Sequence, residues 1–135
     1  MKAAAARALR FGLVGIAGLV VDATVLALLI GVLGPYWGRA LSFLCAVVAT
    51  WALNRRFTFG DRHSGYGLLP EFARYFAAML GGGAVNYAVY ALLLTATGHD
   101  GAWPYVAVAA GSLSGMALNL FLARFAVFRH AVDGD

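Results

Sequence analysis

Residues 10–22 read RFGLVGIAGLVVD, an apolar run with small residues in its middle and an aspartate at its end. Residues 74–86, RYFAAMLGGGAVN, repeat this pattern with an arginine, an aromatic residue, small residues and then an asparagine. Asp22 and Asn86 each follow their arginine by twelve positions and lie 64 residues apart. This self-similarity predicts that the chain contains two copies of one structural unit.

The second part of each copy supports the same interpretation. Residues 54–59, NRRFTF, correspond to residues 123–128, ARFAVF, at an offset of 69 residues. In that register the ladder Ser42, Ala46, Thr50 corresponds to Gly111, Gly115, Asn119. Because this offset exceeds the first by five residues, we expect an insertion of that length between the helices of the second copy.

The composition assigns the chain to the membrane class, since 62% of the residues are hydrophobic and only 12% are charged. Four stretches are nearly free of charge, at about residues 11 to 33, 40 to 54, 75 to 97 and 101 to 123. A spanning helix needs about 20 residues, and the short second stretch reaches this length if Arg39 and Arg55 snorkel at its ends.

We therefore predict an all-α membrane protein with four transmembrane helices built from two repeated helical hairpins. The hairpins cover about residues 9–59 and 73–128, joined by a cytoplasmic linker at about 60–72 within a single domain of residues 1–135. On this topology nine of the ten lysines and arginines lie on one side, and Arg39 alone lies on the other. The positive-inside rule then places both termini in the cytoplasm. Arginines spaced at helix ends form no groove-tracking patch, so we expect no nucleic acid partner.

Asp22 is the most informative single residue, because a carboxylate near the middle of a spanning helix costs several kcal/mol unless it is compensated. It is a candidate ligand-binding or coupling carboxylate for transport. The alternative is a buried structural hydrogen bond with Asn86, Thr24 or an inward-reaching Arg39. Asn54 and Asn119 are further candidates for a polar transport path, although membrane asparagines also serve only to join helices.

The cytoplasmic ends of the four predicted helices carry Arg10, Arg55, Arg74 and Arg124, with Arg56 adjacent to Arg55. A ring of guanidinium groups at headgroup depth is suited to bidentate binding of a phosphate or pyrophosphate. The alternative is that these arginines only anchor the topology and attract anionic lipid.

Enzyme signatures are absent from the sequence. The three histidines have no metal-ligand spacing, and Gly81-Gly82-Gly83 is followed by no Lys-Ser or Lys-Thr pair that would make a phosphate-binding loop. We expect no catalytic residues, no metal site and no cofactor.

The motif Arg10-Phe11-x-x-x-Gly15-x-x-Gly18-x-x-x-Asp22, the block ATWALNRRFTF at 49–59 and the Asn119 to Phe128 segment resemble the GtrA-like family of small four-span membrane proteins. The resemblance implies a flippase, or translocation component, for polyprenyl-phosphate-linked sugars in cell-surface polysaccharide synthesis. It implies a location in the bacterial cytoplasmic membrane and a membrane glycosyltransferase as partner.

Two other functions stay open for a chain of this kind. One is a non-transporting partner or anchor of such a glycosyltransferase. The other is a small multidrug exporter. Exporters of this kind that insert in both orientations have a weak charge bias, so the strong charge asymmetry of this chain argues against that type. Because four helices enclose little volume for a sugar, we also expect a homodimer or a complex with the transferase.

Overall fold

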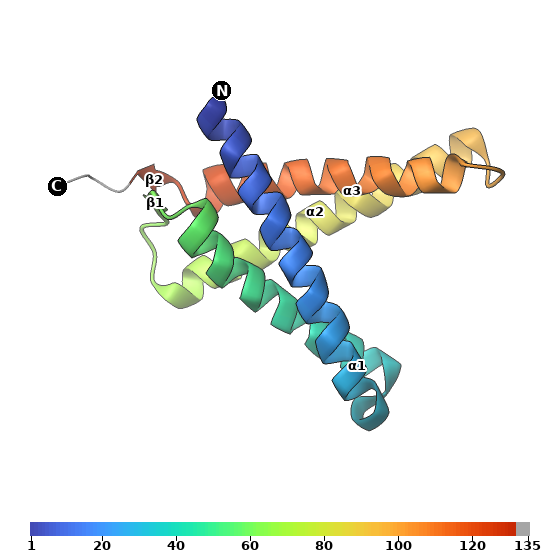
Figure 1. Cartoon of the computed structure of the whole chain (residues 1–135), viewed down its shortest axis with the longest axis horizontal. Helices are drawn as coiled ribbons and strands as arrows, with labels where there is room; N and C mark the ends of the chain where they lie inside the picture. Colours follow the sequence, from blue (N-terminus) through green and yellow to red (C-terminus); the bar gives the residue numbers. More distant parts are fainter. Residues whose placement is uncertain (132–135) are drawn as a thin grey trace. The chain divides into compact units, whose positions relative to one another are not determined.

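The computed structural model describes residues 1–131, and at positions 35, 36, 104, 105 and 108 it describes the backbone alone (Figure 1). The last four residues of the predicted domain therefore lie outside the described part. The chain forms two compact units, one of Met1–Gly65 with the segment from Phe128 onward, the other of Tyr66–Val127. Each unit is described by itself.

The first unit is a helical hairpin made from α1, Lys2–Leu53, which bends back on itself at Gly34 (Figure 1). Gly34 has φ 78° and ψ 175°, a conformation that is essentially restricted to glycine. A proline follows, and proline suits the first position of a helix. The second arm begins directly after the bend, so the two arms are joined without an intervening loop.

The second arm ends in a π-helical turn, η1, at Asn54–Thr58, closed by a hydrogen bond of 2.8 Å from the Phe59 N–H to the Asn54 carbonyl oxygen. The chain then forms β1, Arg62–His63, which pairs antiparallel with β2, His130–Ala131. This ladder has two residues in each strand, and the fold remains that of an all-α protein. Strands this short carry no hydrophobic alternation that a sequence pattern would detect.

The second unit is a pair of helices, α2 at Leu68–Thr97 and α3 at Trp103–Leu122, followed by the π-helical turn η2 at Ala123–Val127. The helices α2 and α3 pack against each other. α2 begins at Leu68, within the stretch of about residues 60–72 that the sequence predicts as the linker. α2 ends at Gly98, whose φ of 84° and ψ of −176° nearly repeat those of Gly34, 64 positions earlier.

The two units repeat the same contacts at the positions that the sequence repeat makes equivalent. A Cβ added at Gly18 would collide with Thr50, and a Cβ added at Gly82 would collide with Asn119. The π-helical turns also correspond, since each begins 69 positions from the other. The additional residues of the second copy form the loop between Gly98 and α3, where the first copy has none.

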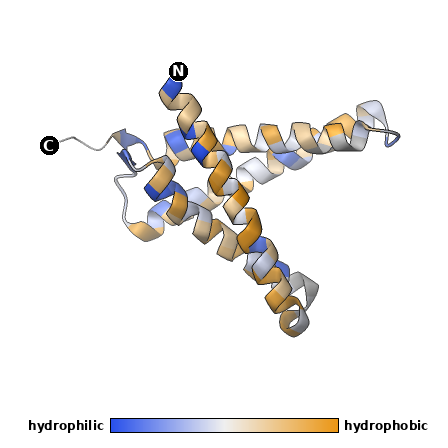
Figure 2. Ribbon diagram, in the orientation of Figure 1, coloured by the Kyte–Doolittle hydropathy of each residue, from blue (hydrophilic) through white to orange (hydrophobic). Residues whose placement is uncertain are grey.

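The helices expose many large apolar side chains, among them Leu19, Leu28 and Val32. Figure 2 shows the arms of α1 mostly in hydrophobic colours, with hydrophilic residues at the N-terminal end and at the β1–β2 ladder. Among the described residues three stretches have the length and hydropathy of membrane spans, namely Lys2–Gly34, Leu68–Thr97 and Ala109–Val127. The chain is thus a helical, multi-pass membrane protein. The second arm of α1, the remaining predicted span, is not among the three.

Candidate functional site

A charged cluster joins the two arms of α1. Asp22 is 8% exposed, and its two carboxylate oxygens have different partners. The Arg39 Nη1 lies 2.6 Å from Oδ2, and the Ser42 hydroxyl donates a hydrogen bond of 2.7 Å to Oδ1. Arg39 is one of the three partners that the sequence suggests for Asp22, whereas Ser42 enters the sequence analysis only as an equivalent position of the repeat.

The Arg39 side chain points inward along the hairpin rather than toward the bend. Asp22 precedes Gly34 by twelve residues, about 18 Å of helix rise, whereas Arg39 follows Gly34 by five residues, about 7.5 Å. The guanidinium therefore reaches toward a carboxylate deeper in the hairpin. Arginines near membrane helix ends usually extend the opposite way, to the interface. The carboxylate supplies the attraction that reverses this direction, because a charge-assisted hydrogen bond is stronger than one between neutral groups.

The second hairpin has no ion pair at the equivalent positions. Asn86 replaces the aspartate, and Gly111 replaces the serine. A Cβ added at Gly111 would lie 2.6 Å from both the carbonyl oxygen and the Oδ1 of Asn86, so the two helices approach closely here. Further along α3, the Oδ1 of Asn119 is buried and has no hydrogen-bond partner among the described residues. The first hairpin thus carries charge where the second carries amides and glycines.

Asn54 belongs to the first unit and is 2% exposed. Its Oδ1 accepts a hydrogen bond of 2.6 Å from the Thr58 hydroxyl, one π-helical turn further along. This contact stabilises the turn that presents Arg55 and Arg56. π-helical turns are rare and are found frequently at functional sites.

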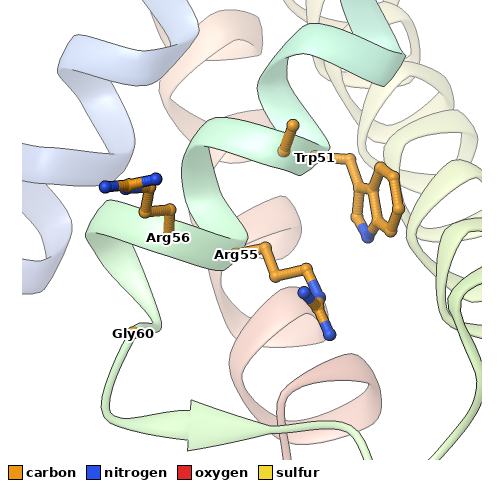
Figure 3. A pocket seen from close by; sticks show the side chains of 5 residues that line it. Trp51, Arg55, Arg56 and Gly60 are labelled. Atoms are coloured by element: carbon orange, nitrogen blue, oxygen red, sulfur yellow. The ribbon is translucent and has the colours of Figure 1, made fainter.

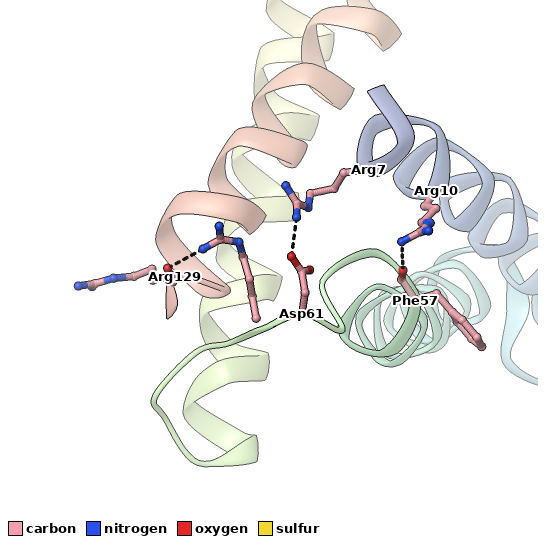
Figure 4. A network of polar contacts seen from close by, with 6 residues as sticks. Arg7, Arg10, Phe57, Asp61 and Arg129 are labelled. Carbon is pink, nitrogen blue, oxygen red and sulfur yellow. Dashed lines mark hydrogen bonds and ion pairs between the residues drawn. The ribbon is translucent and has the colours of Figure 1, made fainter. Parts of the chain in front are cut away.

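A polar cluster lies at the N-terminal end of the first unit (Figure 4). Arg7 forms an ion pair of 2.8 Å with Asp61, and Arg10 donates a hydrogen bond of 3.4 Å to the Phe57 carbonyl oxygen. Arg62 donates to the Arg129 carbonyl oxygen at 3.3 Å. These contacts connect the N-terminal end of α1 with η1 and the segment after it, and connect that segment with the C-terminal segment.

Arg55 and Arg56 line an open pocket of about 580 Å³ together with Trp51, Ala52 and Gly60. Figure 3 shows that the two arginine side chains extend in different directions. The Arg56 guanidinium lies 5.7 Å from the centre of the Phe57 ring. A pocket with cationic and aromatic walls is chemically suited to a phosphorylated headgroup.

The arginines of the second unit also lie over aromatic rings. Arg74 lies 4.2 Å from the centre of the Tyr66 ring, and Arg124 lies 4.7 Å from that of Phe125. Both guanidinium groups lie close enough to the ring for a cation–π interaction. Within the described residues no three histidine, cysteine, aspartate or glutamate side chains are placed to hold a metal ion.

Comparison with known proteins supplies the family. Residues 10–132 match the family described as GtrA/DPMS, transmembrane domain, which is most of the chain. The chain belongs to this family. No protein of curated function matches it significantly. Membership connects this GtrA/DPMS domain with membrane processes that involve polyprenyl-phosphate-linked sugars, and it agrees with the resemblance noted from the sequence.

The predicted site residues of this GtrA/DPMS domain divide between the two units. The first unit holds Asp22, Arg39, Asn54, Arg10, Arg55 and Arg56, and the second holds Asn86, Asn119, Arg74 and Arg124. The structure brings Asp22 and Arg39 together. The ring of arginines and a pairing of Asp22 with Asn86 would both involve the two units, and they stay predictions.

Two residues of the candidate site were not singled out from the sequence. Ser42 follows Arg39 by three positions and therefore shares its helix face. That spacing is the signal from which a shared contact with Asp22 could have been predicted. Trp51 precedes Arg55 by four positions and lines the same pocket. In so apolar a helix, neither residue is distinguishable from a packing residue until its neighbours are known.

Proposed function

We propose that this chain is a translocase, or a translocation component, for polyprenyl-phosphate-linked sugars in cell-surface polysaccharide synthesis. It spans the bacterial cytoplasmic membrane four times, with both termini in the cytoplasm. A membrane glycosyltransferase supplies the lipid-linked sugar, and the working unit is a homodimer or a complex with that enzyme.

The observation that carries the proposal is the Asp22–Arg39 ion pair inside an otherwise apolar hairpin. A charged pair in lipid is costly and is usually found where an ion or a polar substrate passes. The second hairpin packs through Asn86 and Gly111 without any charge, so helix packing alone does not require the pair. A phosphate-bearing substrate supplies a reason for a guanidinium at this depth.

The charge distribution supports the proposed topology. Nine lysines and arginines would face the cytoplasm and Arg39 alone would lie near the outer side, a strong positive-inside bias. The second arm of α1 completes the fourth span if Arg39 and Arg55 extend its ends. On this topology the pocket beside Arg55 and Arg56 lies at the cytoplasmic surface, where it is suited to receive the substrate headgroup.

We also propose that the chain is not an enzyme and uses no cofactor. The sequence has no phosphate-binding loop and no nucleophile paired with a base. Movement of the substrate would then be driven by its own gradient or by an ion gradient.

Transport by purified protein in vesicles tests the proposal. We expect the wild type to carry a fluorescent prenyl-phosphoryl sugar across the bilayer, and the folded Asp22→Asn variant to lose at least about tenfold in rate. That loss corresponds to about 1.4 kcal/mol of barrier height. Asp61→Asn is the matched control, because it removes an aspartate from an exposed ion pair of the same unit. Unchanged transport in Asp22→Asn would reject a role for the charge.

The second candidate is a non-transporting anchor for a glycosyltransferase. Both oxygens of Asp22 are hydrogen-bonded, which is the arrangement that a purely structural clamp between the two arms requires. Vesicles in which the protein moves no lipid-linked sugar, yet raises the activity of a co-reconstituted transferase, would favour the anchor.

A further inference from the structure

We infer that Asp22 competes with the phosphate of the substrate for Arg39. The carboxylate holds the guanidinium in the empty protein, and a phosphate anion takes its place during translocation. The choice of ligand rests on the proposed function, but the exchange is testable by binding alone.

The geometry leaves Arg39 able to accept a second anion. Its guanidinium has five N–H donors, and among the described residues only Nη1 is engaged, with the Asp22 Oδ2. The Arg39 side chain is 58% exposed, whereas that of Asp22 is 11% exposed. Arg39 is thus the accessible member of the pair. A phosphate can take two parallel hydrogen bonds from the unused edge of a guanidinium, an arrangement stronger than the single contact with Asp22.

Ser42 keeps a hydrogen bond to the Asp22 carboxylate when Arg39 turns away. Its hydroxyl lies 2.7 Å from the Asp22 Oδ1 and 3.0 Å from the Arg39 carbonyl oxygen. The hydroxyl has one proton, and an ionised carboxylate is the stronger acceptor. Ser42 is 0% exposed, so this hydrogen bond is retained in a site without bulk water. It lowers the cost of leaving the carboxylate without its cation.

The exchange belongs to the first hairpin alone. At the equivalent positions of the second hairpin the sequence has Asn86, Gly111 and Val108, which offer no carboxylate, hydroxyl or cation. An amide has no charge with which to compete for a guanidinium. Each chain therefore carries one site at which a phosphate can replace the carboxylate as the partner of an arginine. The second hairpin has a similar backbone but lacks this site.

Equilibrium binding of radiolabelled farnesyl phosphate to the protein in nanodiscs of uncharged lipid tests the exchange. Asp22→Asn removes the competitor, and if Arg39 is free about a tenth of the time in the wild type, affinity rises about tenfold. Arg39→Gln removes the receptor and lowers affinity about tenfold or more. Ser42→Ala lowers affinity as well, because releasing Arg39 then leaves Asp22 without any partner.

Each variant has a matched control in the described structure. Asp61→Asn removes an aspartate from the exposed ion pair with Arg7. Arg129→Gln removes an exposed arginine that belongs to no proposed site. Thr95→Ala removes an exposed hydroxyl that donates a hydrogen bond within its own helix, to the Leu92 carbonyl oxygen. We expect all three to bind farnesyl phosphate as the wild type does.

The sign of the Asp22→Asn effect decides between exchange and a static clamp. Unchanged or weaker binding by folded Asp22→Asn would overturn the inference. If that variant does not fold, Ser42→Ala decides, and wild-type affinity in Ser42→Ala would overturn it. Competition by inorganic phosphate or by phosphatidylglycerol in the disc identifies whether free phosphate, bulk lipid or the prenyl phosphate is the preferred source. If Asp22→Asn binds farnesyl phosphate more tightly but the wild type transports nothing, the exchange of ligands at Arg39 is supported and the proposed translocase function is rejected.

Discussion

At the scale of single residues, small side chains decide how closely the helices pack. In the second unit the carbonyl oxygen of Gly82 would lie 2.6 Å from a Cβ at Gly115, and the Cβ of Asn86 would lie 2.9 Å from it. Such contacts replace the hydrophobic drive that is missing between helices in lipid. Gly83, one position further along α2, has nothing within 4 Å of an added Cβ. Adjacent glycines of α2 therefore differ in whether they allow close packing of the helices.

We predict that Gly115→Ala destabilises the α2–α3 pair by about 1–3 kcal/mol, the usual cost of overpacking, because its neighbour is a backbone oxygen that cannot rotate away. Gly83→Ala is the control and is expected to be neutral or stabilising by up to about 1 kcal/mol through helix propensity. Reversible unfolding in mixed micelles measures both. Equal stability of the two variants would contradict the packing argument.

At the scale of helices and turns, the two hairpins are bent by the same device. Gly34 and Gly98 adopt nearly the same positive-φ conformation, and neither has a described neighbour within 4 Å of an added Cβ. Steric contact with a neighbouring residue is therefore not the reason for glycine at these two positions. The backbone conformation itself excludes other residues, since a side chain at this φ and ψ is strained.

Gly34→Ala should therefore destabilise the first hairpin by about 1–3 kcal/mol, the cost of holding an ordinary residue in this region of φ and ψ. Gly31→Ala, in the same arm and equally open, is the control and lacks the strained backbone. Thermal unfolding in detergent should place Gly34→Ala clearly below both Gly31→Ala and the wild type. A melting temperature for Gly34→Ala equal to that of Gly31→Ala would show that the bend tolerates a side chain.

At the scale of the whole chain, the segment after the last helix returns to the first hairpin. Phe128 stacks on Phe59 with ring centres 4.9 Å apart and planes 13° from parallel, and both rings are 0% exposed. These phenylalanines are equivalent positions of the repeat, 69 residues apart. The β1–β2 ladder continues the same association, with His63 opposite His130. The end of the second copy thus completes the packing of the first.

Phe128→Ala should lower the free energy of unfolding by about 3–5 kcal/mol, because it removes a fully buried aromatic ring. It should also release the C-terminal segment, so that trypsin cleaves after Arg129 faster than in the wild type. Phe125→Ala is the control, since that ring is 56% exposed. Identical digestion rates for Phe128→Ala and the wild type would show that the stack does not hold the segment.

The helical membrane class and the repeat register were predictable from sequence, because both depend on local chemistry. Long apolar runs must form helices in lipid, where every backbone hydrogen bond has to be made internally. The offsets of 64 and 69 residues, read from motifs alone, anticipated the equivalent bends at Gly34 and Gly98 and the matching π-helical turns. The residues Asp22 and Arg39 were recognisable because charge is rare in such runs.

The tertiary structure decided which of these groups meet. Asp22 and Ser42 are 20 positions apart, and their contact depends on how sharply the chain bends at Gly34 and on the rotation of the second arm about its axis. The Phe59–Phe128 stack and the β1–β2 ladder join segments from the two ends of the repeat. No periodicity within a helix encodes such long-range contacts, because they depend on how the helix ends are positioned in space.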